Sequence, residues 1–219
     1  MKEFDNLLKT VRVLRSPGGC PWDRAQKISD MKKYLLEEVY ELIDAIDAKE
    51  TEAIKEELGD IFLILAVIAE MHKEKKKFTP EEILEYINEK LISRHPHVFA
   101  SLKLKTKEEV LNHWIINKAK AKKRKSIKDR LPLGAPSLLL AGVFFKERSH
   151  LTKKRTKQDQ EKQLLEVKDK LSGLKVKKNK EKILTDIIFE ICKYGFDLGV
   201  DLEGALRRKV LKAAGGTSY

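Results

Sequence analysis

One helix-length stretch in the first third of the chain is apolar on almost every side. Few polar positions interrupt residues 58–69, and the longest uninterrupted apolar run, residues 61–69, has nine residues. A membrane-spanning helix needs about 20 apolar residues, so we interpret the stretch as a buried helix. Two short amphipathic helices cannot cover it fully. The sequence therefore predicts either a bundle of at least four helices or dimerisation through this helix.

Composition and end signals extend this prediction to an all-α fold, in which a helical bundle or dimerisation covers the apolar helix. Charged residues make up 37% of the chain, whereas only 11 glycines and 6 prolines occur in 219 residues, which is a helix-rich composition. Apolar periodicity and capping residues then give the segments. We expect helices at residues 4–14, from a cap at Ser29 or Asp30 to about Ala48, from Thr51 through the apolar stretch, from Pro80 to about Arg94, and from Thr106 to about Lys120.

The two halves of the chain differ in charge. Residues 1–117 hold 19 basic and 22 acidic residues, whereas residues 118–219 hold 27 and 12, so the net charges are −3 and +15. A cluster of Lys and Arg at residues 118–130, followed by turn residues, marks the boundary. We predict a catalytic helical domain at residues 1–120 and a basic second domain at residues 121–219, with a polar loop at residues 151–163.

Cysteine usage and the first residues indicate the compartment. Only Cys20 and Cys192 occur, far apart, and the chain does not begin with a basic segment followed by an apolar one. This pattern favours the cytoplasm, with no association with a membrane.

Four acids on consecutive predicted helices carry the strongest chemical signal. Glu38 and Glu41 are three residues apart, and Glu57 and Asp60 repeat that spacing after a short turn, so each pair shares a helix face. For any one of these acids, a solvated position on a helix surface is the ordinary interpretation. Four acids on apolar faces would repel each other unless protons or cations compensate. Because neither of these two helices carries a Glu-x-x-His, we expect oxygen ligation of Mg²⁺, or of Mn²⁺, rather than a di-iron site.

Four motifs, in order, resemble those of the MazG nucleoside triphosphate pyrophosphohydrolases. They are residues 19–24 (GCPWDR), 34–41 (YLLEEVYE), 56–60 (EELGD) and 90–99 (KLISRHPHVF). The resemblance covers residues 1–120. It implies a cytoplasmic enzyme of nucleotide pool housecleaning that hydrolyses nucleoside triphosphates to monophosphate and pyrophosphate, acting as a homodimer. It also implies that Glu38, Glu41, Glu57 and Asp60 bind Mg²⁺, with Glu37 as a supporting catalytic acid. Attack at the α or the β phosphorus gives the same products, and both stay open.

Four further residues are expected to bind the substrate. Lys90 and Arg94 share a helix face, and Trp114 and Lys118 repeat that spacing. From spacing alone, surface charges near a helix C-terminus are the better interpretation of Lys90 and Arg94. The resemblance instead implies that both contact phosphate, and that Trp114 and Lys118 make further substrate contacts. A loop residue, Trp22, could stack on a base or anchor its own loop, and both interpretations stay open.

The basic half resembles a second MazG repeat whose acidic motifs have decayed. Residues 169–173 (DKLSG) stand where the first acidic motif is expected, Lys182 replaces an acid of the second, and Asp186 remains. We therefore expect a degenerate repeat without Mg²⁺. A rival hypothesis makes this half a nucleic-acid or protein-binding module and the hydrolase weak or absent. We do not favour nucleic acid as a partner, because the aromatic residues there form no recognised motif.

Overall fold

The computed structural model describes residues 2–111, 113, 126–149, 156–172 and 179–215, and every regular element within these ranges is a helix. This confirms the all-α fold predicted from the sequence. The chain forms two compact units, residues 1–118 and 119–219. None of the helices in the described ranges has the length and apolar character needed to cross a membrane. The assignment of catalysis to the first unit and of a decayed repeat to the second stays a prediction.

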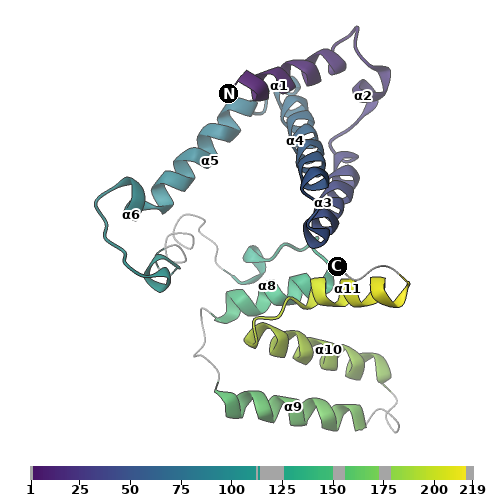
Figure 1. The fold of residues 1–219 in the computed structure, drawn as a ribbon, viewed down its shortest axis with the longest axis vertical. Helices are drawn as coiled ribbons and strands as arrows, with labels where there is room; N and C mark the ends of the chain where they lie inside the picture. The colour runs from purple at the N-terminus through teal and green to yellow at the C-terminus, as the bar shows by residue number, and fades with distance from the viewer. Residues whose placement is uncertain (1, 112, 114–125, 150–155, 173–178, 216–219) are drawn as a thin grey trace. The chain divides into compact units, whose positions relative to one another are not determined.

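The first unit is built on a helical hairpin. Its helices are α1 (Lys2–Arg15), α2 (Pro21–Ala25), α3 (Met31–Ala48), α4 (Thr51–Glu74), α5 (Pro80–Arg94) and α6 (Pro96–Phe99). Figure 1 shows α3 and α4 lying side by side, with α1 packed against α4 and α5 running away from the hairpin. The short helices α2 and α6 lie in segments for which the sequence predicted no helix. The boundaries of α3, α4 and α5 match the expected ones closely.

A turn of two residues joins α3 to α4. Lys49 adopts a left-handed conformation (φ 60°), and its backbone N–H donates to the carbonyls of Ala45 and Ile46. The backbone N–H of Glu50 also donates to the Ala45 carbonyl, at 3.1 Å. These bonds satisfy carbonyl groups that the end of a helix otherwise leaves without partners. The turn therefore ends α3 sharply and lets α4 begin at Thr51.

The core of the first unit lies along the buried side of α4. Leu8 and Val11 of α1 pack with Ala66, and Met31 of α3 packs with Ile64 and Met71. Burial of such side chains contributes about 25 cal/mol per Å² of apolar surface.

The opposite side of α4 is apolar but exposed within one chain. Leu58, Phe62 and Leu65 keep 42%, 53% and 48% of their surface accessible. The prediction that this helix is covered on nearly every side is therefore not met by the helices of a single chain.

The start of α5 shows the capping chemistry expected from the sequence. The Thr79 side chain accepts from the Glu82 backbone N–H, and the Glu82 carboxylate accepts from the Thr79 backbone N–H. This reciprocal pair, with Pro80 at the first helical position, satisfies donors that have no partner within the helix. Of the helix expected from Thr106 to Lys120, residues 107–111 are helical, and most of the remainder lies outside the described residues.

The second unit contains a 3₁₀ turn (Lys128–Arg130) and the helices α8 (Ser137–Ser149), α9 (Lys157–Ser172), α10 (Lys180–Asp197) and α11 (Leu202–Ala213). Helix α10 contacts both α8 and α9 (Figure 1). Phe145 is buried at the centre, with its ring centroid 4.9 Å from Phe189 and 6.5 Å from Phe196. An aromatic cluster thus forms the core of this unit.

The loop expected at residues 151–163 is wrong over its second half, because residues 157–163 belong to α9. The hydroxyl of Thr156 accepts from the backbone N–H of Asp159, which starts the helix. Gln163, only 3% exposed, then donates to both the backbone carbonyl and the carboxylate of Glu190 on α10. A polar segment is therefore helical here because its polar side chains have partners.

Candidate active site

The α3–α4 hairpin brings together three of the four acids identified in the sequence. Carboxylate oxygens of Glu38, Glu41 and Glu57 all lie within 4.8 Å of one another. Glu38 and Glu57 are half-buried, whereas Glu41 is exposed. The carboxylates meet because residues three apart share a helix face and the short turn aligns the two faces. Across the described parts of the chain, no other set of three acidic, histidine or cysteine side chains is arranged to hold a metal ion.

The electrostatics of this cluster favour a bound cation. Partial burial raises the pKa of Glu38 above its ordinary value, and the charges of Glu41, Asp60 and Glu57 raise it further. The pKa of Glu57 is also raised, first by desolvation and then by the Glu41 charge. One oxygen of Glu57, Oε2, is buried and has no hydrogen-bond partner. Because a carboxylate oxygen without a partner is costly, the donor set fits a hard divalent cation such as Mg²⁺.

Asp60 and Glu37 lie at the edge of the cluster. Asp60 is half-buried and lines a cavity together with Glu38. Glu37 points elsewhere, since its carboxylate pairs with Lys33 at 3.5 Å along α3. The structure therefore brings together Glu38, Glu41 and Glu57, with Asp60 beside them, and leaves Glu37 outside the group.

The cavity beside the acids has a volume of about 210 Å³. Aliphatic side chains of α1, α3 and α4 line it together with Trp22, Asp23 and Gln26. The ring of Trp22 lies 6.0 Å from that of Tyr34, which also lines the cavity, at an interplanar angle of 59°. Sequence reasoning noticed Trp22 but could not place it, because α2 reaches the acids only through tertiary packing.

The loop that leads into α2, the helix that carries Trp22, is tied to the end of α1. The backbone N–H of Cys20 donates to the Leu14 carbonyl at 2.8 Å. A side chain at Gly19 would clash with the carbonyl oxygens of Val13 and Leu14. Glycine is therefore required at this close approach of two backbone segments.

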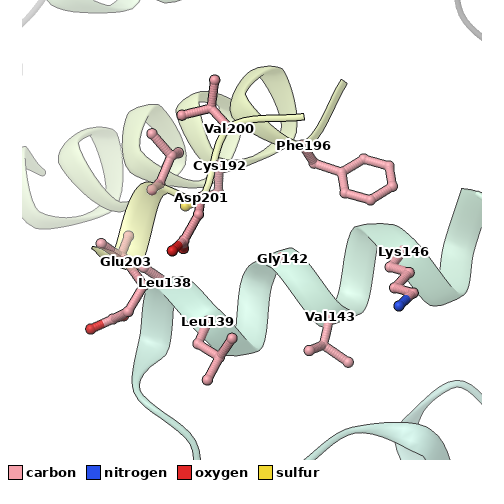
Figure 2. Close-up of a pocket in the computed structure, with 11 residues that line it drawn as sticks. Leu138, Leu139, Gly142, Val143, Lys146, Cys192, Phe196, Val200, Asp201 and Glu203 are labelled. Atoms are coloured by element: carbon pink, nitrogen blue, oxygen red, sulfur yellow. The ribbon is translucent and has the colours of Figure 1, made fainter. Parts of the chain in front are cut away.

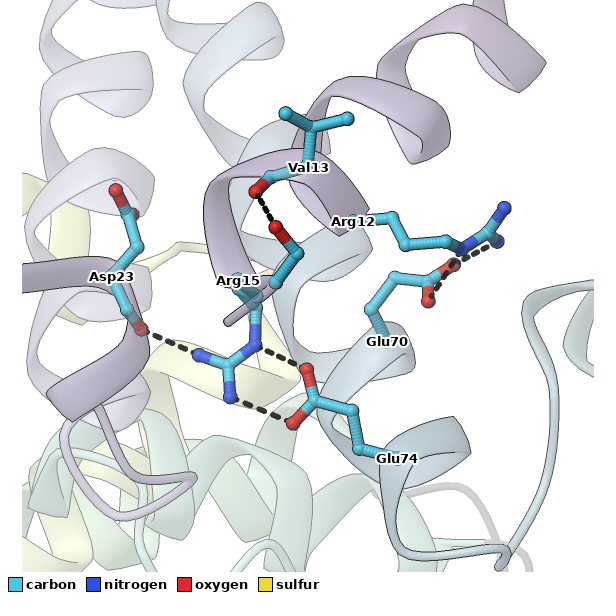
Figure 3. Close-up of polar contacts among 7 residues, drawn as sticks. Arg12, Val13, Arg15, Asp23, Glu70 and Glu74 are labelled. Carbon is cyan, nitrogen blue, oxygen red and sulfur yellow. Dashed lines mark hydrogen bonds and ion pairs between the residues drawn. The ribbon is translucent and has the colours of Figure 1, made fainter. Parts of the chain in front are cut away.

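Arg15 connects three segments of the first unit (Figure 3). Its Nε and Nη2 donate to the two carboxylate oxygens of Glu74 at 2.7 and 2.8 Å, and its Nη1 donates to the Asp23 backbone carbonyl at 2.6 Å. A second arginine of α1, Arg12, donates in a similar forked way to the buried Glu70. Two-pronged arginine–carboxylate pairs give orientation as well as energy. Helix α1 and the start of α2 are thereby held in register with α4.

Of the four residues expected to bind substrate, the structure describes Lys90 and Arg94. Lys90 and Arg94 lie near the end of α5, which diverges from the hairpin (Figure 1), and neither lines the cavity. Lys90 Nζ lies 5.7 Å from the Tyr86 ring centroid. Trp114 and Lys118 lie outside the described residues. The substrate-binding role of all four stays a prediction.

A second cavity, of about 190 Å³, lies between α8, α10 and α11 (Figure 2). Its lining is mainly apolar, with Lys146 on one side and Asp201 and Glu203 on the other. Burial raises the pKa of the Cys192 thiol, which lines this cavity. A buried thiol with a raised pKa is a poor nucleophile, so the cavity offers no evident catalytic group.

Comparison with known proteins agrees with the geometry of the first unit. The family model for the MazG nucleotide pyrophosphohydrolase domain matches residues 26–99, a range that contains the four acids. The chain is 36% identical over 214 residues to the nucleoside triphosphate pyrophosphohydrolase/pyrophosphatase MazG of Thermotoga maritima, which is 95% of this chain and 82% of that protein.

Two further relatives match over a shorter range. The nucleoside triphosphate pyrophosphohydrolase of Escherichia coli K12 is 37% identical over 145 residues, 64% of this chain and 55% of that enzyme. The uncharacterized protein YabN of Bacillus subtilis is 38% identical over 146 residues, 66% of this chain and 30% of its own length. Since the Thermotoga relative is 36% identical and the match spans 95% of this chain and 82% of that protein, this chain belongs to the MazG nucleotide pyrophosphohydrolase family.

Proposed function

We propose that the chain hydrolyses nucleoside triphosphates to nucleoside monophosphate and pyrophosphate in a Mg²⁺-dependent reaction, as a housecleaning enzyme of the nucleotide pool. The observation that carries the proposal is the convergence of Glu38, Glu41 and Glu57 within 4.8 Å, including a buried carboxylate oxygen without a partner. Relatives named as nucleoside triphosphate pyrophosphohydrolases support the reaction class.

In the proposed site, Glu38, Glu41 and Glu57 hold Mg²⁺ and Asp60 completes the set from the cavity side. Bound Mg²⁺ neutralises charge on phosphate oxygens and makes water a stronger nucleophile at neutral pH. The uncompensated acids cannot bind a triphosphate by themselves, because like charges repel. Glu37, one position before Glu38 and paired with Lys33, is proposed as a supporting acid. Lys90, Arg94, Trp114 and Lys118 are proposed to contact the substrate.

Pyrophosphate release tests this assignment. The assay uses the full chain, Mg²⁺ and a panel of canonical and damaged nucleoside triphosphates, and compares wild type with Glu57→Gln. Glu52→Gln is the matched control, since Glu52 is an exposed acid of the same helix that pairs with Lys55 at 3.3 Å. We expect loss of release in Glu57→Gln and wild-type release in Glu52→Gln. Full activity in Glu57→Gln would refute the metal assignment, and no release by wild type would refute the function.

We also propose that the enzyme is a homodimer joined through the exposed face of α4. Leu58, Phe62 and Leu65 place a continuous apolar strip on that face, and large apolar patches on a protein surface mark interfaces. A second copy would bury the strip and would bring a second α5, with its Lys90 and Arg94, into the assembly. Sedimentation of wild type and Phe62→Arg tests this: we expect a dimer and a monomer, and a monomeric wild type would refute the proposal.

A further inference from the structure

The cavity beside the acids opens onto the proposed metal site. Glu38 belongs both to the carboxylate cluster and to the cavity lining, and Asp60 also lines the cavity. A molecule bound through phosphate at the cluster therefore has its remaining part directed to the cavity. We propose that this cavity is the base-binding subsite, in which Trp22 stacks on the nucleobase and Gln26 hydrogen-bonds its edge. The proposal deepens the proposed function and rests on it for the position of the phosphates.

The residues that line the cavity offer little positive charge to hold a phosphate. Glu38, Asp60 and Asp23 are acidic, and the cavity lining holds a single basic residue, Arg15. The guanidinium of Arg15 is already engaged by both oxygens of Glu74 and by the Asp23 carbonyl (Figure 3). Because no other cation among the described residues lines the cavity, a neutral group is favoured there. The base is the part of a nucleotide that is flat, uncharged and largely apolar on its faces.

The cavity has the size of such a part. Pockets for drug-sized ligands measure roughly 300–1,000 Å³, whereas this cavity has about 210 Å³. It can therefore take a base but not a whole nucleotide, which leaves the sugar and phosphates to extend toward Glu38 and Asp60. Its aliphatic wall, including Met31, Leu63 and Ile64, matches the apolar face of a base.

Trp22 has the exposure and orientation needed to stack. Its side chain keeps 58% of its surface accessible although it lines the cavity, and its ring is tilted by 59° against Tyr34 rather than stacked on it. A large aromatic side chain that stays this exposed contributes little stability to the fold. Stacking on a base would bury this surface, and every base offers a flat face for it.

Gln26 supplies a polar group that can either donate or accept a hydrogen bond. It is half-buried, and its amide nitrogen makes one long hydrogen bond, 3.4 Å, to the Trp22 carbonyl. An amide offers both a donor and an acceptor. It can therefore pair with purines and pyrimidines alike, so we expect similar binding of all four common bases, dominated by stacking.

The test measures binding of nucleoside monophosphates in the presence of Mg²⁺, by calorimetry on the full chain; a monophosphate has no pyrophosphate to release, so the measurement does not depend on hydrolysis. We expect wild type to bind, Trp22→Ala to bind at least about fivefold more weakly for each of the four bases, and Trp22→Phe to bind nearly as wild type. Gln26→Ala is the second variant, expected to weaken binding with Trp22 intact.

Tripolyphosphate, which has no base, provides the matched probe. Its inhibition constant with Mg²⁺ should be the same in wild type and in Trp22→Ala. Equal monophosphate affinities of wild type and Trp22→Ala, or no binding by wild type, would overturn the base subsite. Binding of monophosphates without pyrophosphate release from any triphosphate would instead refute the proposed function alone.

Discussion

Two Glu→Gln substitutions, at Glu38 and at Glu70, should change stability in opposite directions. Both residues lie in the α3–α4 hairpin, but their surroundings differ. Glu38 faces other carboxylates, whereas Glu70, 3% exposed, accepts hydrogen bonds from Arg12 at 2.6 and 3.3 Å. Removal of a negative charge relieves repulsion at the first position and weakens an ion pair at the second. The two variants therefore distinguish the carboxylate cluster, whose charges repel one another without a cation, from Glu70, whose ion pair stabilises the fold.

The distances give the size of each effect. Two full charges 4.8 Å apart repel by about 3.5 kcal/mol at an effective dielectric constant of 20. Glu38 is only partly buried, so solvent screens this repulsion, and we expect Glu38→Gln to gain about 1 kcal/mol in the absence of metal. Glu70→Gln keeps one acceptor but loses a charge-assisted pair, at a cost of about 1–2 kcal/mol.

Thermal unfolding with a chelator and with Mg²⁺ measures both effects. For a unit of this size, 1 kcal/mol corresponds to about 4 °C in Tm. We expect Tm to rise in Glu38→Gln and to fall in Glu70→Gln when metal is absent. Mg²⁺ at 100 times its Kd should stabilise wild type and Glu70→Gln by about 2.7 kcal/mol, and Glu38→Gln much less. A metal-free Glu38→Gln less stable than wild type, or one with the full Mg²⁺ response, would contradict the reasoning.

Three further outcomes are expected. The pKa values of Glu38 and Glu57 are raised in the folded chain, so the metal-free protein should lose stability as pH rises from the ordinary glutamate pKa through the raised values. Measurements of Tm against pH should show this fall. Saturating Mg²⁺ should remove it. Met71→Ala, at a side chain 2% exposed, should cost about 2–5 kcal/mol in urea unfolding, whereas Val13→Ala, at a side chain 65% exposed, should cost little. Arg15→Lys should raise KM for the triphosphate more than it lowers kcat, because a lysine cannot hold Glu74 and the Asp23 carbonyl together; an unchanged KM would argue against a positioning role.

The helices were predictable where local chemistry decides them. Thr79, Pro80 and Glu82 encode the start of α5 without help from the rest of the chain, and the structure has the expected capping box. The convergence of Glu38, Glu41 and Glu57 was predictable too, because a short turn between two helices leaves few ways to align their faces. Residues 157–163 were mistaken for a loop because the partner of Gln163 lies on another helix, 27 residues later.

The cavity and its arginine were not predictable for the same reason. Arg15 and Glu74 are 59 residues apart, and their pairing depends on where α1 packs along the length of α4. The sequence identifies Trp22 as an aromatic residue that could stack on a base, but its distance from the acids depends on the loop that follows α1. Sequence patterns report one helix face at a time, whereas a site formed by three segments depends on packing.

The length of the turn at Lys49 and Glu50 determines how the acids of α4 align with those of α3. An α-helix advances about 100° per residue, so one residue inserted or deleted there would rotate Glu57 away from Glu38 and Glu41 by more than a quarter of a turn. Neither turn residue belongs to the cluster, and substitutions that preserve the left-handed conformation at Lys49 should be tolerated. Changes in chain length at this point should not be. The spacing between the two acidic motifs is therefore as much a part of the proposed site as the acids themselves.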